Sequence, residues 1–522
     1  MIRIRDISLS PEHDANQLLY EAAKLLNISG SKIRKLSLVR RSIDARKKPD
    51  VRIIYTVDVS VDGSEQKILK QCGCKRTSIV HKTYYEVPKA LSDERPVIVG
   101  FGPAGMFAAL VLALAGLRPI VLERGEDAMT RHEKVARFFA TGQLDTRSNV
   151  QFGEGGAGTF SDGKLNTGVN NVRIGWILEQ FVKAGAAEDI LFDAKPHIGT
   201  DVLLEVVQNL RRRIISLGGE VRFNTQIAGI CAENGVLTGL ETNQGHIPCT
   251  NAIFAIGHSA RDTFSMLHDL GIKMEAKPFS MGVRIEHKQK AIDTAQYGSA
   301  DLPLPPADYK LVKHLENETV YTFCMCPGGY VVAAASEEGG VVTNGMSYAD
   351  RGGENANAAL LVTLNPEDFP FSGVLGGMQW QRQIEQRAFA VSGSYRAPAQ
   401  LVGDFLANKA SQGAGSVQPT YRPGITWCDL HDVLPAKISN AIAEALPQLD
   451  QNLKGFADAD AVLTAPETRS SSPVRILRDE TRMGSIKGFY PAGEGAGYAG
   501  GIMSAAIDGM QSAEALIAAL NE

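Results

Sequence analysis

Three glycines and one acid in this sequence have the spacing that binds a dinucleotide. Gly100, Gly102 and Gly105 form G-x-G-x-x-G between a short β-branched run and a helix of small residues. The first glycine permits a tight turn, the second lets the backbone approach a pyrophosphate, and the third lets the helix pack on the strand. Glu123 closes the next apolar run, where a carboxylate accepts ribose hydroxyls. Residues 97–125 are thus predicted to hold the ADP half of a dinucleotide, with Pro103, Ala104 and Arg124 at the same site.

A second glycine-rich segment, residues 149–168, reads NVQFGEGGAGTFSDGKLNTG. Glycines between small and polar residues do not form a long regular element, but they let the backbone wrap closely around a flat ligand. A mobile surface loop is the alternative, and the flanking Phe152 and Phe160 argue against it. The ligand contacts expected here are Gly155, Gly156, Ala157, Gly158, Thr159, Phe160, Ser161 and Asp162.

A third segment, residues 488–509, reads GFYPAGEGAGYAGGIMSAAIDG and predicts a strand, a glycine turn and a helix. Glu494 is expected to bind a ribityl hydroxyl or, through water, a phosphate. The positive end of the helix is expected at the pyrimidine edge of a flavin. Two distant segments then fit one extended ligand, which favours non-covalent FAD over NAD. The further contacts expected are Gly493, Gly497, Gly500, Gly501 and Ile502, together with Ile227, Ala255 and Gly257.

Four polar residues are candidates for catalysis beside the flavin. Lys164 follows the glycine-rich segment and is expected near the flavin ring, and His197 has the pKa range of an acid or base at neutral pH. Arg469 has the geometry to hold a substrate carboxylate. Each has a structural alternative: Lys164 pairs with Asp162, His197 is satisfied at a helix start, or Arg469 pairs with Glu467. The full set of candidates is Lys164, His197, Asn344 and Arg469.

Two C-x-C pairs, Cys72/Cys74 and Cys324/Cys326, are a separate source of chemistry. Side chains alternate in an extended chain, so such a pair forms a strained disulfide unless a turn intervenes. Gly73 permits that turn in the first pair. A thiol relay is therefore left open for both pairs. No metal site is expected, because no histidine lies near either pair at ligand spacing.

The composition indicates what class of protein positions these residues. The chain has 522 residues, of which 44% are hydrophobic and 21% charged, as is ordinary for a globular protein. No apolar stretch approaches the roughly 20 residues that cross a bilayer, and the N-terminus lacks the apolar core of a signal peptide. The seven cysteines have no framework spacing, which is typical of reduced thiols. We therefore expect a cytoplasmic protein without membrane contact.

The expected fold class is α/β, with four segments. A small α+β, ferredoxin-like module spans residues 1–89. A Rossmann-like FAD-binding domain spans residues 90–272 and returns at residues 456–522. Between these two parts, residues 273–455 lack a nucleotide signature and are expected to form an inserted α+β substrate or cap domain.

The first module is basic, with 18 Lys/Arg against 10 Asp/Glu over residues 1–89, whereas the whole chain carries −4. This charge could serve an acidic electron-carrier protein or a nucleic acid. No aromatic residues interleave with the basic cluster, which disfavours single-stranded nucleic acid. The alternative is that these basic residues bind no partner and form a solvated sheet edge. The cluster consists of Arg40, Arg41, Arg46, Lys47 and Lys48.

Taken together, the motifs resemble those of a family, the bacterial FAD-dependent dehydrogenases of uncertain substrate in the glutathione-reductase-like, two-dinucleotide-binding superfamily. The sequence motifs that resemble this family are, in chain order, SIDARKK, VIVGFGPAGMFAAL, NVQFGEGGAGTFSDGKL, KPHIGTD, PFSMGVRIEH, CPGG, TNGMS and GFYPAGEGAGYAGGI. The resemblance covers nearly the whole chain. It implies bound FAD, a small α+β domain in front and an inserted domain over the flavin.

The function expected from these observations is that of an FAD-dependent oxidoreductase, a dehydrogenase or reductase, which transfers hydride between flavin and a small organic substrate. No second dinucleotide-binding unit that would make a dedicated NAD(P)H domain is expected, so NAD(P)H is expected at most as a transient donor. Two alternatives stay open. One is a flavoprotein that acts on RNA, as in tRNA modification, and the other is an FAD-binding redox sensor without turnover.

Overall fold

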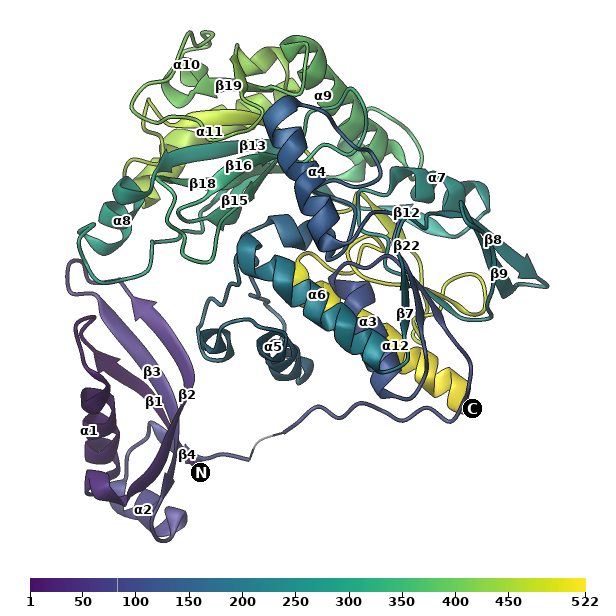
Figure 1. Ribbon diagram of the computed structural model, residues 1–522. Helices are drawn as coiled ribbons and strands as arrows, with labels where there is room; N and C mark the ends of the chain where they lie inside the picture. Colours follow the sequence, from purple (N-terminus) through teal and green to yellow (C-terminus); the bar gives the residue numbers. More distant parts are fainter. Residues whose placement is uncertain (82) are drawn as a thin grey trace.

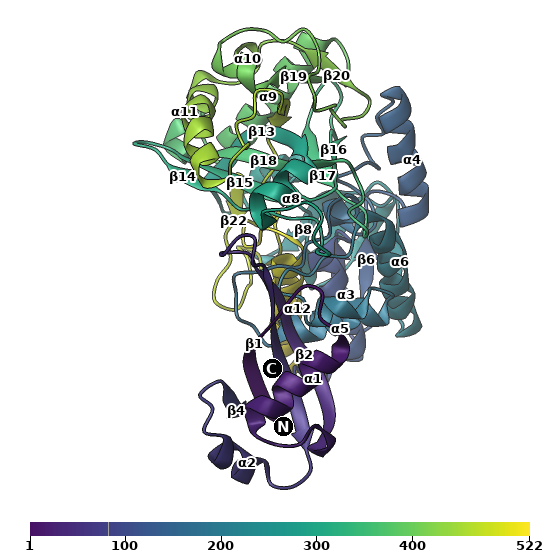
Figure 2. The ribbon, with the colours of Figure 1, turned by 90° about the vertical axis from the view of Figure 1, so that its left-hand side faces the viewer.

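The computed structural model describes residues 1–81 and 83–522, which form three sheet-based parts (Figure 1). The first part is small and lies at one end of the molecule in both ribbon views (Figures 1 and 2). The second is built on a parallel sheet and the third on a larger, mostly antiparallel sheet. Within the described ranges, every helix is too short or too polar to span a membrane.

The N-terminal part alternates strands and helices in the order βαββαβ, with an antiparallel sheet in the order β2-β3-β1-β4, the split βαβ arrangement. Alternation in β1 sends Ile2 and Ile4 into a core with Leu18 and Leu26 of α1. Asp14 caps α1 by accepting a hydrogen bond from the Gln17 N–H. The elements are β1 (Ile2–Leu9), α1 (Ala15–Leu26), β2 (Ile33–Asp44), β3 (Arg52–Val61), α2 (Glu65–Cys72) and β4 (Thr77–Ile79).

The central part is a five-stranded parallel sheet in the order β23-β11-β5-β6-β7. Its strands are short, and all but the edge strand β7 are buried, as both faces of the sheet are covered. The strands are β5 (Val97–Val99), β6 (Ile120–Leu122), β7 (Glu220–Arg222), β11 (Ala252–Phe254) and β23 (Phe489–Pro491). The helices of this part are α3 (Pro103–Leu114), α4 (Ala128–Thr141), α5 (Arg173–Lys183), α6 (Thr200–Ser216), α7 (Arg261–Asp269) and α12 (Ile502–Asn521).

The C-terminal helix α12 returns beneath this sheet and packs on α3, side by side with it in Figure 1. The contact depends on Gly509, where a Cβ atom would lie 2.0 Å from the carbonyl oxygen of Ala104. A three-stranded antiparallel meander adds β8 (Ile227–Glu233), β9 (Val236–Thr242) and β10 (Gly245–Pro248). Its turns lie at residues 234–235 and 243–244.

The third part is a seven-stranded sheet in the order β14-β15-β18-β13-β21-β19-β20, antiparallel except for β19 beside β20. Strand β21 lies beyond residue 455, where the sequence suggests a domain boundary, yet it belongs to this sheet. The strands are β13 (Phe279–Lys288), β14 (Val312–His314), β15 (Thr319–Cys326), β18 (Asn355–Leu364), β19 (Ala397–Leu401), β20 (Ile425–Trp427) and β21 (Val462–Glu467).

The remaining elements cover or connect this sheet. Two two-stranded ladders pair β16 (Tyr330–Ala333) with β17 (Thr343–Met346) and β12 (Met274–Ala276) with β22 (Val474–Ile476). Helix α11 contributes Ile438, Ile442 and Leu446 to the core of the large sheet. The helices are α8 (Gln289–Tyr297), α9 (Gly376–Ser392), α10 (Val402–Leu406) and α11 (Ala436–Asn452).

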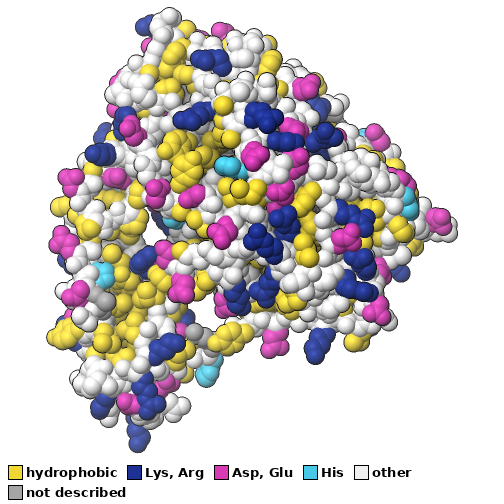
Figure 3. All heavy atoms as spheres, viewed as in Figure 1, with side chains coloured by type: hydrophobic (Ala, Val, Ile, Leu, Met, Phe, Trp, Pro, Cys, Tyr) yellow, Lys and Arg dark blue, Asp and Glu magenta, His cyan; other side chains and the backbone are white. Residues whose placement is uncertain are grey.

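The β2–β3 hairpin of the N-terminal part reaches the other two parts (Figure 1). Arg41 donates two hydrogen bonds to Asp193, at 2.6 and 2.9 Å, and the Lys48 ammonium donates to a carbonyl of α8. Arg46 pairs within the hairpin with Asp44. Three of the five residues of the basic cluster therefore have partners inside this chain. On the face shown in Figure 3, basic and acidic side chains are interspersed.

Candidate functional site

A cavity of about 760 Å³ lies between the ends of the central strands β5 and β6 and the seven-stranded sheet. All three glycine-rich segments of the sequence reach its wall. The predicted residues that line it are Gly100, Gly102, Pro103, Ala104, Glu123, Arg124, Gly156, Ala157, Gly158, Ser161, Lys164, Ile227, Ala255, Gly257, Asn344, Arg469, Glu494, Gly500, Gly501 and Ile502.

At one end of the cavity, Gly100 lies in a tight turn and Gly105 lies at the contact between strand and helix. Gly100 has φ +99°, and a Cβ atom there would lie 2.3 Å from the Ala255 carbonyl oxygen. A Cβ atom at Gly105 would lie 2.0 Å from the Gly100 carbonyl oxygen, so this glycine sets the contact between strand and helix. Gly102 caps α3, and Pro103 takes the first helical position. The free N–H groups of α3 therefore face the cavity, where they can bind a diphosphate.

Glu123, at the end of β6, organises the backbone around this end. Its Oε2 accepts a hydrogen bond from the Phe101 N–H at 2.9 Å. Its Oε1 accepts from the N–H groups of Gly125 and Gly153, at 2.9 and 3.0 Å. A carboxylate has about four acceptor positions, so Oε2 keeps room for a ribose hydroxyl. Glu123 thus joins the first and second glycine segments, a role that its sequence position alone does not show.

Arg131 of α4 holds the second glycine segment in place, and sequence reasoning missed it. This side chain is fully buried, and its guanidinium donates to the carbonyl oxygens of Asn149, Val150, Glu154 and Gly156 at 2.7 to 2.9 Å. The guanidinium also lies over the ring of Phe160. The segment is therefore a fixed wall of the cavity, and Gly156–Phe160 forms a short 3₁₀ turn within it.

The N-terminus of α12 meets the cavity at Gly500, Gly501 and Ile502. The positive end of this helix dipole can stabilise negative charge on a ligand. Glu494 lies close by, and burial raises the pKa of its carboxyl to about 7. His258, which the sequence did not single out, lies with its Nε2 3.9 Å from Glu494 Oε1. Burial, with help from Arg469 and a second arginine, lowers the pKa of His258 to about 3, so its imidazole is neutral.

The structure brings together three of the four catalytic candidates. Lys164 lines the cavity, and its Nζ is buried without a hydrogen-bond partner among the described residues; the Asp162 carboxylate is 3.5 Å away. Burial alone would lower the pKa of Lys164, but Asp162 and two cysteines raise it. Asn344 accepts a hydrogen bond from Arg284 at 3.1 Å. His197 does not line the cavity: its Nε2 contacts the Ala349 carbonyl at 3.1 Å.

Arg469 lines the cavity, but its guanidinium is committed to a carboxylate that it shares with Arg261. Its guanidinium makes two hydrogen bonds to Glu385, at 2.8 and 3.0 Å, and Arg261 makes two more to the same carboxylate. Glu467, the partner considered from the sequence, instead binds Arg284 at 2.8 Å. Arg469 therefore lies in the cavity wall with its guanidinium held by Glu385.

Several predicted contacts lie behind the cavity wall. Asp162 is buried and binds Arg351 and Ser347, and Lys164 and Arg351 hold its pKa at about 2 against the effect of burial. The Gly493 N–H donates to Asp508 at 2.7 Å. The others also pack within the protein and do not line the cavity. They are Gly105, Gly155, Thr159, Phe160 and Gly497.

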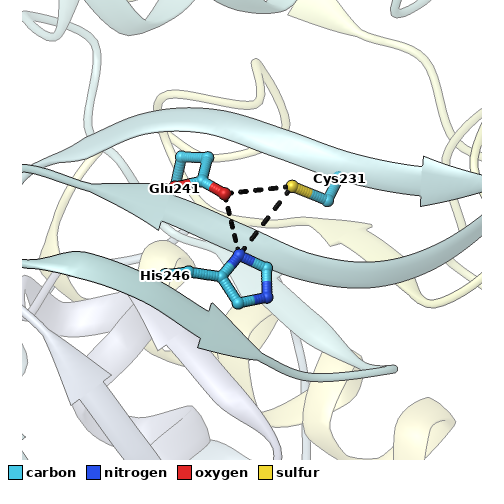
Figure 4. A group of neighbouring side chains, drawn as sticks. All are labelled: Cys231, Glu241 and His246. Atoms are coloured by element: carbon cyan, nitrogen blue, oxygen red, sulfur yellow. Dashed lines mark hydrogen bonds and ion pairs between the residues drawn. The ribbon is translucent and has the colours of Figure 1, made fainter.

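A separate polar cluster lies on the outer meander, where Cys231, Glu241 and His246 come from three adjacent strands (Figure 4). The Glu241 carboxylate accepts from the Cys231 thiol at 3.4 Å and contacts His246 Nδ1 at 2.8 Å. These contacts satisfy the three side chains without an ion, and none of the three lines the cavity. The expectation of no metal stays a prediction.

The cavity fits FAD. Two helix N-termini converge on it, and a Cβ atom at Gly100, Gly153 or Gly163 of its wall would lie 2.3 to 2.9 Å from a neighbouring atom. The Lys164 ammonium adds a buried donor that still needs an acceptor. The fold and the cavity together define a dinucleotide-binding α/β protein with a second sheet over the ligand site.

Comparison with known proteins identifies the family. Residues 278–470 match the family described as FAD-dependent protein, C-terminal domain-like, and residues 1–60 match a Domain of unknown function (DUF8436). A protein of Clostridium beijerinckii, described as an uncharacterized protein, is 47% identical over 525 residues, covering 99% of this chain and 98% of that protein. The chain belongs to the same family as this clostridial protein, and it carries a domain of FAD-dependent proteins.

Solved structures match only at a distance. Glycine oxidase of Bacillus cereus is 12% identical with a TM-score of 0.34, over 82% of this chain and 98% of that chain. Glycerol-3-phosphate dehydrogenase of Bacillus halodurans, complexed with FAD, is 10% identical with a TM-score of 0.34, over 83% and 66%. A geranylgeranyl bacteriochlorophyll reductase-like protein of Thermoplasma acidophilum is 12% identical with a TM-score of 0.36, over 82% and 80%. These likenesses are too distant to add to the geometry of the site.

Proposed function

We propose that the protein is an FAD-dependent oxidoreductase that transfers hydride between bound flavin and a small organic substrate. One observation carries the proposal: a single cavity joins the N-terminus of α3, the N-terminus of α12 and a far end with titratable side chains. The first helix end suits the diphosphate and the second suits the pyrimidine edge of the flavin. Bound flavin would supply the electron-transfer chemistry.

The residues at the far end divide the remaining tasks. Lys164 pairs with Asp162 at 3.5 Å, but its Nζ has no hydrogen-bond partner among the described residues, so this side chain would hold a substrate anion or negative charge on the reduced ring. Glu494, with its pKa of about 7, can hold or release a proton at neutral pH. Arg469 acts as a positioning residue, because its guanidinium is committed to Glu385.

The electron donor is tested by anaerobic reduction. The FAD-loaded chain is mixed with NADH, with NADPH or with a pool of metabolites, and the flavin absorbance is followed. The proposal expects rapid bleaching with at least one donor and sustained turnover with an acceptor. Turnover in the Lys164→Met variant should fall at least tenfold, while Lys183→Met, an exposed lysine of α5, should match the parent.

Two results would overturn the proposal. A chain that neither retains nor takes up FAD has no flavin chemistry. Bound FAD without turnover in any donor and acceptor pair would instead favour a redox sensor. No observation favours action on RNA, since Arg41, Arg46 and Lys48 of the basic cluster already bind within the chain.

A further inference from the structure

Strand β15 ends in a local irregularity that brings two cysteines together. Its pairing with β18 is regular up to Phe323 and resumes at Cys326, with a shift of register between them. Cys324 lies within this bulge and has φ +42°, a backbone conformation that non-glycine residues adopt infrequently. In a regular strand the two side chains would lie on one face with their Cα atoms about 7 Å apart, and the bulge bends the backbone between them. The Cys326 Sγ lies 3.3 Å from the Cys324 carbonyl oxygen.

The two thiols have different access to the ligand site. Cys324 is half-buried and lines the cavity, on the same wall as Lys164, whereas Cys326 is fully buried behind it. This is the arrangement of an attacking thiol with a resolving thiol next to it. The other C-x-C pair, Cys72 and Cys74, lies at the end of α2 in the N-terminal part, away from the cavity.

Charged groups from four parts of the chain face Cys324. Lys164 and Asp162 come from the second glycine segment, Arg284 from β13, Glu467 from β21 and Glu494 from the third glycine segment. Arg284 donates a hydrogen bond to the Cys324 carbonyl oxygen at 2.9 Å and holds Glu467 at 2.8 Å.

These surroundings favour a thiolate at Cys324. A hydrogen bond from the Cys326 thiol is the largest cause that lowers the pKa of Cys324, and Lys164 and Arg284 add to it. Together they bring this pKa to about 6 despite burial. The pKa of Cys326 is raised for the complementary reason, because it donates to the thiolate and is buried.

We propose that Cys324 and Cys326 are a redox-active dithiol that passes an electron pair to the bound flavin, and that the electron donor is a small thiol. In the internal step, the Cys324 thiolate and the Cys326 thiol form one S–S bond, and the Cys326 S–H bond breaks. One proton and two electrons leave the sulfur atoms and are taken up by the oxidised flavin. Two molecules of a small thiol then restore the dithiol by exchange and leave as their disulfide.

The proposal relies on the proposed function only for the electron acceptor, so the dithiol is first tested without flavin. The cofactor-free full-length chain is equilibrated in glutathione buffers of graded potential, blocked with iodoacetamide and analysed as peptides. The expected product is a peptide in which Cys324 and Cys326 are linked and two hydrogens lighter. The matched pair Cys72 and Cys74 should stay alkylated at potentials where the cavity pair is already oxidised.

The rate of alkylation against pH tests the environment of Cys324. Its midpoint is expected near pH 6. At about pH 6, Cys324 should react about tenfold faster than the exposed-sheet Cys231, once the lower nucleophilicity of an acidic thiol is counted. The variants Cys326→Ala and Lys164→Met should each raise the midpoint by about one unit. Cys326→Ser keeps a hydroxyl donor and should shift the midpoint less, which separates loss of the donor from loss of folding.

The electron path is tested with the FAD-loaded chain and dithiothreitol under anaerobic conditions. Bleaching of the flavin should slow at least tenfold in Cys324→Ser and in Cys326→Ser, and should be unchanged when Cys72 and Cys74 are both serine. Absence of the linked peptide, or an alkylation midpoint above about pH 8, overturns the dithiol and leaves the oxidoreductase standing. A linked peptide with bleaching that does not depend on Cys324 overturns the electron path. Failure to bind FAD overturns the proposed function alone.

Discussion

Substituting Glu123 by glutamine changes one atom and tests how the cavity is preorganised. The carboxylate accepts three backbone hydrogen bonds, from Phe101, Gly125 and Gly153. An amide that keeps its oxygen toward the two glycines directs its NH₂ group at the N–H of Phe101. One charge-assisted bond, worth about 2 kcal/mol, is then lost, and the other two weaken by about 0.5 kcal/mol each. The substitution therefore costs about 3 kcal/mol.

This cost is expected mainly in cofactor binding, because FAD requires the two glycine segments in fixed positions. Titration of FAD into the cofactor-free chain should give a Kd raised about 30- to 150-fold, with any remainder seen as a lower Tm. Glu179→Gln, at an exposed position of α5, is the control and should leave both quantities unchanged. If Glu123→Gln matched this control in Kd and in Tm, the carboxylate would not organise the site.

Three further substitutions test the packing and the charges around the cavity. Gly509→Ala should lower the free energy of unfolding by about 1–3 kcal/mol in urea, since its Cβ would overlap the α3 backbone, whereas Gly175→Ala, with open space around it, should not destabilise. Glu385→Gln leaves the buried Arg469 without its carboxylate and Arg261 with Glu337 alone, and should cost about 3–5 kcal/mol, against under about 0.5 for the exposed Glu354→Gln. The carboxyl of Glu494 has a raised pKa, so its contribution to stability is complete below about pH 4.5 and is lost as the pH rises through about 7. The cofactor-free parent should therefore lose stability relative to Glu494→Gln between these pH values, and parallel pH profiles of the two would contradict this.

The central fold was predictable because its signals are local. A Cβ atom at Gly100 or Gly105 would lie 2.3 or 2.0 Å from a backbone carbonyl oxygen, so only glycine satisfies the turn and the strand–helix contact. The small residues of 502–509 likewise signal a helix that packs closely, and Gly509 is where α12 meets α3. Such constraints on the backbone can be recognised from residue types at short spacing in the sequence.

Long-range pairing could not be predicted in the same way. Arg469 and Glu467 are two residues apart, yet their side chains bind different partners, Glu385 and Arg284. Arg131 binds backbone carbonyl groups. Every residue type carries such a group, so the residue types at these positions do not indicate the contact. The thiol environment of Cys324 depends on a strand bulge and on cations from other elements, which no spacing within C-x-C contains.

The most direct test of the central claim is calorimetric titration of the cofactor-free chain with FAD and, separately, with NAD⁺. The claim is that one cavity holds the whole of FAD, from the α3 N-terminus to the α12 N-terminus. It predicts one FAD bound per chain at least a hundredfold more tightly than NAD⁺, and released intact when the protein is unfolded. Equal affinity for the two dinucleotides, or no binding of FAD, would contradict it.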